Sequence, residues 1–480
     1  MSYLTINSAI GWTKKIGLGL SGMLILLTLI SSPALAAEVG EVSFVRGIVS
    51  ATTANGELRL VNRNAKILEK DTIQTGKDSI AVIRFIDDTH MTLRPHTTFR
   101  IDEYKYNNSA EQDKGFFSLV KGGFRALSGF LSKNSPDSVK YSTTTATIGV
   151  RGTEFDARLC EPGECGQTKK SRSASKNKPQ HSLVVGRVAF KKGELIAINA
   201  LKKSSTQLSS GGPVYQGDRL ITGNGDIAVI AFTDQSRVTL LSNSQLVVEQ
   251  FKYEPEQPRK NISFFNLLKG GVRAVTGLIA GLNRENVQFK TLTATIGVRG
   301  TGFDILCDGS CQPGKGRKPM RVNVWDGSVA ILQPDRETIV SSGNSALVQS
   351  PYDEPAVAPS NKRDLQNIPS RPDSLDVDFE QLFGQSPMSS SDPDAGLYVS
   401  VYDGHVSVEN DTSERVDIGA GESAFSGVSG NVIRLDQIPD FQINDSIPAP
   451  DEITSAVENT MSLLSSSPQS SSQGLECSIN

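Results

Sequence analysis

The sequence has little of the chemistry that most enzyme active sites need. Its 480 residues include four histidines and five cysteines, and aromatic residues make up 6%. No H-E-x-x-H, G-x-S-x-G or S-x-x-K motif occurs in the context that its enzyme class requires. Beyond the N-terminal region there is no long apolar run, which argues against a polytopic membrane protein. We therefore expect neither catalysis nor a cofactor.

The net charge of −3 conceals a basic body and an acidic end. Residues 1–350 carry 44 Lys+Arg and 30 Asp+Glu, a net of +14, whereas residues 351–480 carry 5 and 22, a net of −17. The basic side chains are scattered without an aromatic-rich cluster, so nucleic acid is not an expected partner. We expect contacts of the acidic tail with the basic body, or of the body with anionic material of the cell envelope.

The N-terminus has the pattern of a secretory signal peptide. Two lysines precede an uncharged run at 16–30, and Ala34 and Ala36 form an A-x-A cleavage site before Ala37. We expect residues 1–36 to be removed and the mature chain to lie in the periplasm. The alternative is an uncleaved anchor in the membrane.

A long internal duplication organises the chain. T-A-T-I-G-V-R-G-T occurs at 145–153 and again, unchanged, at 293–301. At nearly the same offset, F-F-S-L-V-K-G-G-F-R-A-L-S-G at 116–129 matches F-F-N-L-L-K-G-G-V-R-A-V-T-G at 264–277. Such ordered self-similarity indicates two tandem copies of one domain.

Each copy has the pattern of an all-β domain. Runs at 80–85 and 227–232 are β-prone, and each precedes a polar turn and a Thr/Leu-rich run, which is typical of a hairpin. No long stretch keeps a 3.6-residue apolar period, so extended helices are not expected. The Asp-Gly pairs at 326–327 and 403–404 lie between alternating apolar residues and predict two-residue hairpin loops with positive φ at both positions.

Four of the five cysteines form close pairs, one after each copy. In an exported chain, Cys160/Cys165 and Cys307/Cys311 favour local disulfides. A single zinc site or unpaired thiols are the alternatives. Cys477 is left over, and its role is not predicted.

Repeats and shifts in composition divide the chain into seven segments. They are a signal peptide (1–36), a first β domain (37–167), a basic linker (168–181), a second β domain with a closing hairpin (182–349), a Pro/Ser/Asp-rich linker (350–395), a C-terminal β unit (396–450) and an acidic, Ser-rich tail (451–480).

The order of these motifs resembles the FecR-domain family. The pattern is a strand ending in Phe, an Asp-containing turn and V/M-T-L, then L-x-K-G-G-x-R-A, T-A-T-I-G-V-R-G-T-x-F-D and V-x-V-x-D-G-x-V, between about residues 39 and 425. The resemblance implies an all-β domain outside the cytoplasmic membrane. The best-known members also carry a cytoplasmic anti-sigma segment. Only 15 residues precede the apolar run here, so the chain resembles a stand-alone, exported, duplicated type.

The repeated R-G-T-x-F-D element allows a binding and a structural interpretation. Its Arg lies between glycines, where a guanidinium can grip a carboxylate or phosphate. The structural interpretation is favoured: the glycines permit a bulge, and each Arg pairs internally with the following Asp. The residues concerned are Gly149, Arg151, Gly152 and Asp156 in the first copy and Gly297, Arg299, Gly300 and Asp304 in the second.

We expect a non-enzymatic sensory or binding scaffold for a protein or polymer of the cell envelope. A membrane-anchored signalling regulator is the alternative, and an enzyme acting on envelope glycans is a third possibility. A metal site from Asp88, His90 and His96 is conceivable, but a solvated hairpin edge is favoured, because the second copy does not repeat the histidines.

Overall fold

The structure is a computed structural model, which describes residues 36–109, 111–165, 184–199, 204–311, 319–361, 372–387, 394–443 and 450. The signal segment up to residue 35, the basic linker 168–181 and the tail 451–480 with Cys477 lie outside these residues. Among the described residues, no helix is long and apolar enough to cross a membrane.

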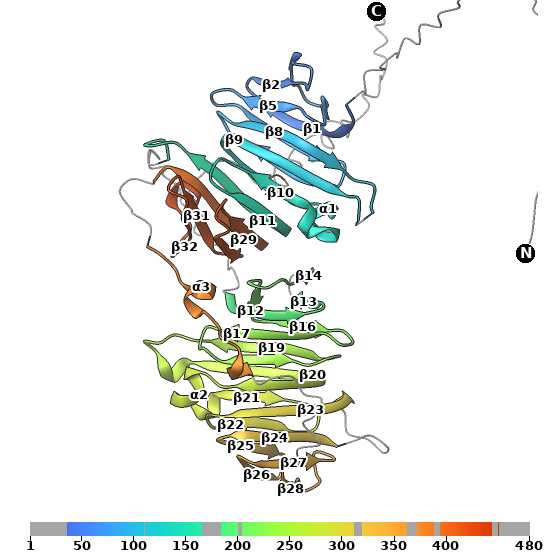
Figure 1. The fold of residues 1–480 in the computed structure, drawn as a ribbon, viewed down its shortest axis with the longest axis vertical. Helices are drawn as coiled ribbons and strands as arrows, with labels where there is room; N and C mark the ends of the chain where they lie inside the picture. Colours follow the sequence, from blue (N-terminus) through green and yellow to red (C-terminus); the bar gives the residue numbers. More distant parts are fainter. Residues whose placement is uncertain are drawn as a thin grey trace, which may run out of the picture. The chain divides into compact units, whose positions relative to one another are not determined.

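The described chain folds into two β-sheets, one for each copy of the duplication (Figure 1). The first sheet contains β1–β11 together with β29–β32, and the second contains β12–β28. Alternating apolar residues bury one face of most strands, as the sequence patterns require. The predicted all-β class and the two tandem copies are confirmed.

The strands of the first sheet are β1 (Glu38–Arg46), β2 (Val49–Thr52), β3 (Leu58–Leu60), β4 (Lys66–Leu68), β5 (Thr72–Thr75), β6 (Ile80–Phe85), β7 (His90–Leu93), β8 (Thr98–Lys105), β9 (Lys114–Leu127), β10 (Val139–Ser142), β11 (Thr147–Cys160), β29 (Gly396–Glu409), β30 (Arg415–Gly419), β31 (Ser423–Gly427) and β32 (Val432–Leu435). Those of the second are β12 (Val184–Lys192), β13 (Leu195–Asn199), β14 (Ser204–Gln207), β15 (Pro213–Tyr215), β16 (Asp218–Thr222), β17 (Ile227–Phe232), β18 (Arg237–Leu240), β19 (Gln245–Lys252), β20 (Ile262–Val275), β21 (Val287–Lys290), β22 (Thr295–Val298), β23 (Gly302–Ser310), β24 (Met320–Asp326), β25 (Ser328–Gln333), β26 (Arg336–Ser341), β27 (Asn344–Val348) and β28 (Ala356–Pro359). The helices are α1 (Phe130–Asn134), α2 (Leu278–Leu282), α3 (Phe379–Phe383) and α4 (Asp440–Ile443), with 3-10 turns η1 (Pro136–Ser138), η2 (Pro258–Lys260), η3 (Arg284–Asn286) and η5 (Pro372–Ser374).

The hairpin after the first β-prone run is present in both copies, as predicted. β6 pairs antiparallel with β7, and β17 pairs antiparallel with β18. The buried Asp87 holds the first turn: its carboxylate accepts hydrogen bonds from the Thr89 amide at 3.1 Å and from the Tyr104 hydroxyl at 2.8 Å.

The Asp-Gly pairs mark bulges and not the predicted hairpin loops. β29 runs through Asp403 and Gly404 without turning back, and its partner β30 follows a turn at 410–414. Gly404 has a φ of +85° and Gly327 a φ of +66°, but neither of the preceding aspartates has a positive φ. A two-residue type I′ loop needs positive φ at both positions, so the glycine alone bends the strand.

The C-terminal β unit, predicted at 396–450, belongs to the sheet of the first copy and completes it. β29 pairs antiparallel with β11, with Phe155 opposite Val401. In the second copy β24 pairs with β23 in the same register, with Phe303 opposite Val324. Without β29, β11 would expose an unpaired edge. The second copy is therefore inserted between β11 and the closing strands of the first.

Each copy has its own hydrophobic core, and aromatic rings pack at equivalent positions in both. The ring centroids of Phe117 and Tyr141 are 4.9 Å apart, and those of Phe265 and Phe289 are 4.7 Å apart. A third, smaller core lies at the end of β11 and the start of β29. Its members are Cys160, Cys165, Tyr398, Phe425, Leu435 and Phe441.

Candidate functional site

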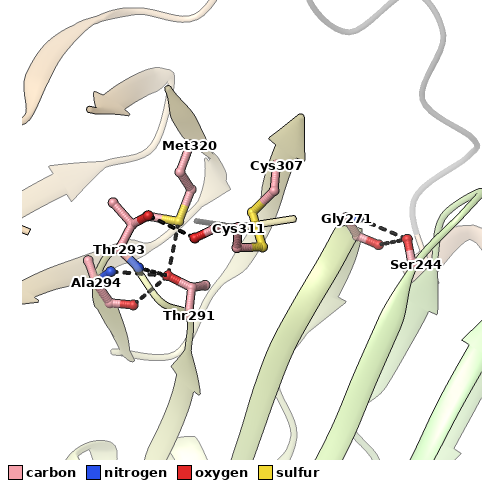
Figure 2. The surroundings of a disulfide bond; sticks show 8 residues. All are labelled: Ser244, Gly271, Thr291, Thr293, Ala294, Cys307, Cys311 and Met320. Atoms are coloured by element: carbon pink, nitrogen blue, oxygen red, sulfur yellow. Dashed lines mark hydrogen bonds between the residues drawn. A yellow bond between two sulfur atoms is a disulfide. The ribbon is translucent and has the colours of Figure 1, made fainter. Parts of the chain in front are cut away.

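The two predicted disulfides are present. Cys160 is bonded to Cys165, and Cys307 is bonded to Cys311. Figure 2 shows the second bond near the start of the repeated element, where the Thr293 hydroxyl donates a hydrogen bond to the Cys311 carbonyl oxygen at 3.0 Å. Each disulfide thus restrains the chain just after the repeated element. Because the four cysteines are bonded in pairs, they are not available as zinc ligands.

The repeated arginines are paired, but not with the predicted aspartates. Arg151 Nη2 donates to Asp137 Oδ1 at 2.5 Å, and Arg299 Nη2 donates to Glu337 Oε1 at 2.6 Å. Both carboxylates are exposed, Asp137 to 87% and Glu337 to 46%. The Arg151 side chain itself is only 16% exposed, whereas Arg299 is 45% exposed, so the second pair is of the exposed kind that contributes about 0–1 kcal/mol.

The aspartates of the repeated element are instead buried and have other partners. Arg94 binds Asp156, and Arg273 Nε donates to Asp304 Oδ1 at 2.7 Å. Burial raises the pKa of the Asp304 carboxyl, and the charge of Arg273 opposes this only in part. These pairs lie between strands of the core, so both aspartates are structural.

The repeat glycines have two different roles. Gly152 has a φ of +56° and Gly300 a φ of +75°, which glycine adopts without strain, and the predicted bulge lies there. A Cβ at Gly149 would lie 2.6 Å from Ser407 Oγ, so this glycine allows a close approach of β29. Gly297 has no comparable close contact.

A hollow of about 360 Å³ lies over the repeated strand of the first copy, and we call it hollow 1. Its cations are Lys140 of β10, Arg151 of β11 and Arg415 of β30. Arg415 forms an ion pair with Asp417, whereas Lys140 forms no ion pair with any described residue. The rest of the lining consists of Asp137, Val139, Ser142, Thr147, Gly149, Ser407, Glu409 and Asn410.

The second copy has a hollow of about 420 Å³ over the equivalent strands, which overlaps the matching place only in part and which we call hollow 2. Gln288 occupies the position of Lys140, and Leu332 occupies the position of Glu409 in the shared strand registers. Thr295 replaces Thr147 without a change of residue type. The lining of hollow 2 contains no charged side chain. The positions of Lys140, Arg151 and Arg415 are thus taken by Gln288, Arg299 and Glu337, so that the second copy keeps one of the three cations and Glu337 pairs with it.

The histidines near the first hairpin do not assemble a metal site. His90 Nε2 lies 3.3 Å from Asp88 Oδ1, and Arg84 Nε donates to the same oxygen at 3.0 Å. Within the described ranges, no three His, Cys, Asp or Glu side chains gather to hold a metal ion. The Arg84 contact fits the interpretation as a hairpin edge.

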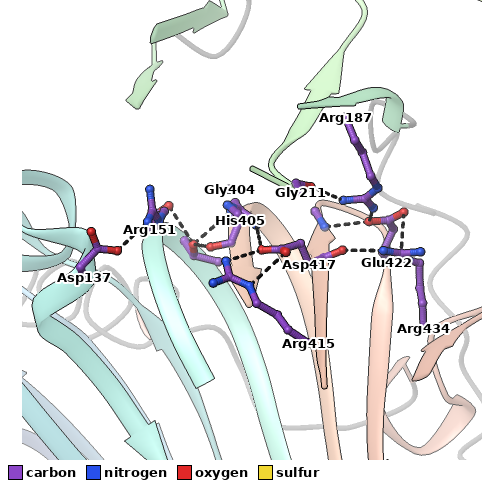
Figure 3. A network of polar contacts seen from close by, with 12 residues as sticks. Asp137, Arg151, Arg187, Gly211, Gly404, His405, Arg415, Asp417, Glu422 and Arg434 are labelled. Atoms are coloured by element: carbon purple, nitrogen blue, oxygen red, sulfur yellow. Dashed lines mark hydrogen bonds and ion pairs between the residues drawn. The ribbon is translucent and has the colours of Figure 1, made fainter. Parts of the chain in front are cut away.

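A buried ionic network joins the closing segment of the first copy to the beginning of the second (Figure 3). Arg187 of β12 donates hydrogen bonds to Glu422 and, at 3.0 Å, to the Gly211 carbonyl oxygen. Arg434 Nη2 donates to the Asp417 carbonyl oxygen at 2.8 Å. The Arg187 side chain has no exposed surface. A buried charge is tolerated only when it is paired, so this contact is specific.

Charges within this network shift the pKa of two members. Burial by itself would raise the pKa of the Asp417 carboxyl, but His405 at 2.8 Å and Arg415 at 2.8 Å outweigh it and hold the pKa well below its usual range. Burial and, next, the neighbouring Arg187 lower the pKa of the Arg434 guanidinium to about 10. Asp417 is thus a fixed negative charge between hollow 1 and the contact of the copies.

Sequence reasoning missed Lys140, Arg415 and Arg187, which supply most of the positive charge described above. None of them belongs to the repeated motifs that drew attention. The available signal was the difference between the copies: Lys140 aligns with Gln288, and Arg187 aligns with Glu41. Positions at which duplicated domains differ in charge mark surfaces that have acquired separate roles.

Comparison with known proteins agrees with the duplicated plan. The family model described as FecR protein matches residues 71–188 and 218–330. Two crystal structures of a candidate anti-sigma factor from Parabacteroides distasonis share 15% identity with this chain, at a TM-score of 0.24. Each similarity covers 37% of this chain and 83% of the other. No curated protein matches the sequence.

Proposed function

Because this chain belongs to the FecR protein family, we propose that it is a non-enzymatic scaffold of the periplasm that binds an anionic polymer of the cell envelope at hollow 1. The observation that carries the proposal is the placement of Lys140, Arg151 and Arg415 in one hollow over the repeated strand. At the matching positions the second copy has Gln288, Arg299 and Glu337, so it lacks two of these cations and gains a carboxylate.

The lining of hollow 1 suits a saccharide that carries carboxylate groups. Arg151 and Lys140 supply donors for carboxylates, and the hydroxyl groups of Ser142, Thr147 and Ser407 can bond to sugar hydroxyls. The carboxylate of Glu409 and the exposed Asp137 moderate the positive charge, which favours a spaced polyanion over a compact one such as phosphate. Hollow 2 offers polar but uncharged contacts for a neutral part of the same polymer.

Binding to a defined anionic saccharide tests this function. The mature chain, residues 37–480, is titrated with an oligogalacturonate and with a neutral maltooligosaccharide in a calorimeter at low and high salt. We expect binding of the anionic saccharide only, weakened by salt because the contact is electrostatic. Lys140→Glu should weaken it about tenfold, which corresponds to about 1.4 kcal/mol.

Gln288→Glu is the matched control, because it introduces the same charge at the equivalent position of hollow 2. It should change the affinity of hollow 1 by less than about twofold, since distant exposed charges are screened. Equal binding of both saccharides, or equal loss in both variants, would contradict the proposal.

The location in the periplasm and the competing role as a membrane-anchored regulator depend on residues 1–36. Export with cleavage predicts that the purified protein begins at Ala37, and N-terminal sequencing of the envelope fractions tests this. Full-length chain in the membrane fraction would favour the regulator. Release of reducing sugars from the oligogalacturonate would instead support an enzyme.

A further inference from the structure

The contact between the two copies pairs one end of the second copy with the closing strands of the first. The Tyr215 hydroxyl accepts a hydrogen bond from the Ala420 amide at 2.7 Å and donates one to the Gly404 carbonyl oxygen at 3.3 Å. Gly211 lies so close to Asp417 that a Cβ would be 2.2 Å from its carboxylate oxygen. The contact is therefore directional. We call the end of a copy that corresponds to β12–β15 its head and the end that corresponds to β29–β32 its tail, so the head of the second copy meets the tail of the first.

Because the copies are duplicates, each contact residue has a counterpart at an open end of the molecule. The strand registers show this equivalence: Gly40 pairs with Phe85 as Gly186 pairs with Phe232. The loop before β4 has an equivalent in the second copy. The Asn64 amide donates a hydrogen bond to the Val42 carbonyl oxygen, and the Gly211 amide donates one to the Val188 carbonyl oxygen in the same way. Among the residues that the structure describes, the head of the first copy and the tail of the second take no part in such a contact, and we call them the free head and the free tail.

The free head of the first copy carries positive charge at two positions where the head of the second copy, which lies in the internal contact, has neutral residues. Arg59 corresponds to Thr206, and Arg63 corresponds to Ser210. Thr206 and Ser210 both line hollows at the contact between the copies. Arg63 is exposed, and Arg59 extends from the edge strand β3, pairs with the buried Asp71 and keeps 27% of its side chain exposed.

The free tail is negatively charged at the opposing positions. Asp326 corresponds to Asp403, which lies across the internal hollow from Thr206. Glu337 corresponds to Arg415, which lines a hollow with Ser210. Transfer of the internal contact to the free ends therefore places Arg59 opposite Asp326 and Arg63 opposite Glu337.

We infer that a second copy of this chain docks its free head on the free tail, by the geometry that joins the two copies internally. Two contacts between opposite charges are added to the existing pairs of Arg59 with Asp71 and of Glu337 with Arg299. Ile339, which is 44% exposed, is covered at the position of Asp417. The internal pair of Arg187 and Glu422 is replaced by Glu41 and Asn344, so no like charges meet. In such a head-to-tail contact each molecule keeps one end unoccupied, so further molecules can add and form rows.

Sedimentation velocity on the mature chain tests this inference. At low salt we expect association that grows with concentration above roughly 10 μM and is lost at high salt, because exposed charges drive it. Arg63→Glu should weaken association about tenfold or more, and Glu337→Lys should do the same. The Arg63→Glu variant has an altered head and an intact tail, and the Glu337→Lys variant has an intact head and an altered tail.

The two variants mixed in equal amounts distinguish a head-to-tail contact from a symmetric dimer. The intact tail of the Arg63→Glu protein meets the intact head of the Glu337→Lys protein, so complexes should reappear. Lys260→Glu, an exposed charge reversal in the η2 turn between β19 and β20, is the control and should associate as the wild type does. Wild-type chains that stay monomeric at low salt, or variants that fail to restore complexes on mixing, would overturn the inference.

Discussion

Arg187 and Glu422 are 235 positions apart in the sequence and form a buried ion pair between the two copies. The pair is confined to the internal contact, because the counterparts of these residues at the open ends are Glu41 and Asn344. Duplicated domains usually keep their core and diverge at their surfaces, and here the divergence distinguishes an internal contact from the open ends of the molecule.

Removal of one partner of this pair should be costly. We expect Glu422→Ala to lower the free energy of unfolding by about 3 kcal/mol, because it leaves the fully buried Arg187 without its carboxylate. Urea unfolding followed by circular dichroism measures the loss. Asn344→Ala, at the equivalent position of the second copy, should change the free energy by less than about 0.5 kcal/mol. Equal effects of both substitutions would mean that the pair does not stabilise the contact.

Asp417 should make stability depend on acid. Its pKa lies below the ordinary value of 3.8, so the folded protein holds the proton less tightly than the unfolded chain does. The contribution is therefore complete above about pH 5 and is lost as the pH falls through the ordinary pKa and below it. The groups that face the carboxylate are His405, Arg415 and, at its backbone, Arg434.

Asp417→Asn tests this dependence. At neutral pH it should lower the free energy of unfolding by about 3 kcal/mol, and the difference from the wild type should shrink between roughly pH 5 and pH 2. Urea titrations at a series of pH values give the comparison. A difference that stays constant over this range would show that the carboxylate charge is not responsible.

The disulfide between Cys160 and Cys165 should contribute more to the free energy of unfolding than the closure of its loop alone would. Closing a loop of this size contributes about 2 kcal/mol in the chain-entropy model. Cys160 and Cys165 also pack with Phe441 and Tyr398 in the smallest core. We expect their joint replacement by Ser to cost more than about 2 kcal/mol and to increase cleavage by protease near α4. Mass mapping of the unreduced wild type should show both bridges, and a stable, protease-resistant double variant would contradict the packing role.

Gly404 should not tolerate a side chain. Its φ is +85°, and a Cβ there would lie 2.3 Å from the Gly152 carbonyl oxygen. Gly56 has a φ of +82° and no heavy atom within 4 Å of its Cβ position, so it isolates the backbone strain alone. We expect Gly56→Ala to cost about 1 kcal/mol and Gly404→Ala roughly 1–3 kcal/mol more. Thermal unfolding measures both, and similar shifts would mean that β29 moves freely away from β11.

Two predictions that depend on neighbouring residues were confirmed, and a third was not. The disulfide between Cys160 and Cys165 closes a loop of a few residues, and the hairpin at Asp88 is set by a polar turn between two β-prone runs. The Asp-Gly prediction was wrong because the bulge at Gly404 and a type I′ loop share a residue pattern and differ only in the φ of the aspartate. Local chemistry does not distinguish the two.

The partners of charged residues depend on the fold. Arg151 was predicted to pair with Asp156, five positions away, but the register of β11 is irregular between Arg151 and Glu154, which separates the two residues along the strand. Its actual partner, Asp137, precedes β10, and Asp156 is bound by Arg94 from another strand. Charge attracts at any sequence separation, so spacing alone cannot choose among carboxylates.

The sequence by itself determined the all-β class, the duplication and both disulfides, because periodicity, repetition and short loops are encoded within a few residues of one another. Only the tertiary structure decided that β29 closes the first copy, that the second copy is inserted before it, and that three cations meet in hollow 1. Strands pair through backbone groups that every residue carries. The choice of partner strand therefore depends on the packing of a whole core and not on any local pattern.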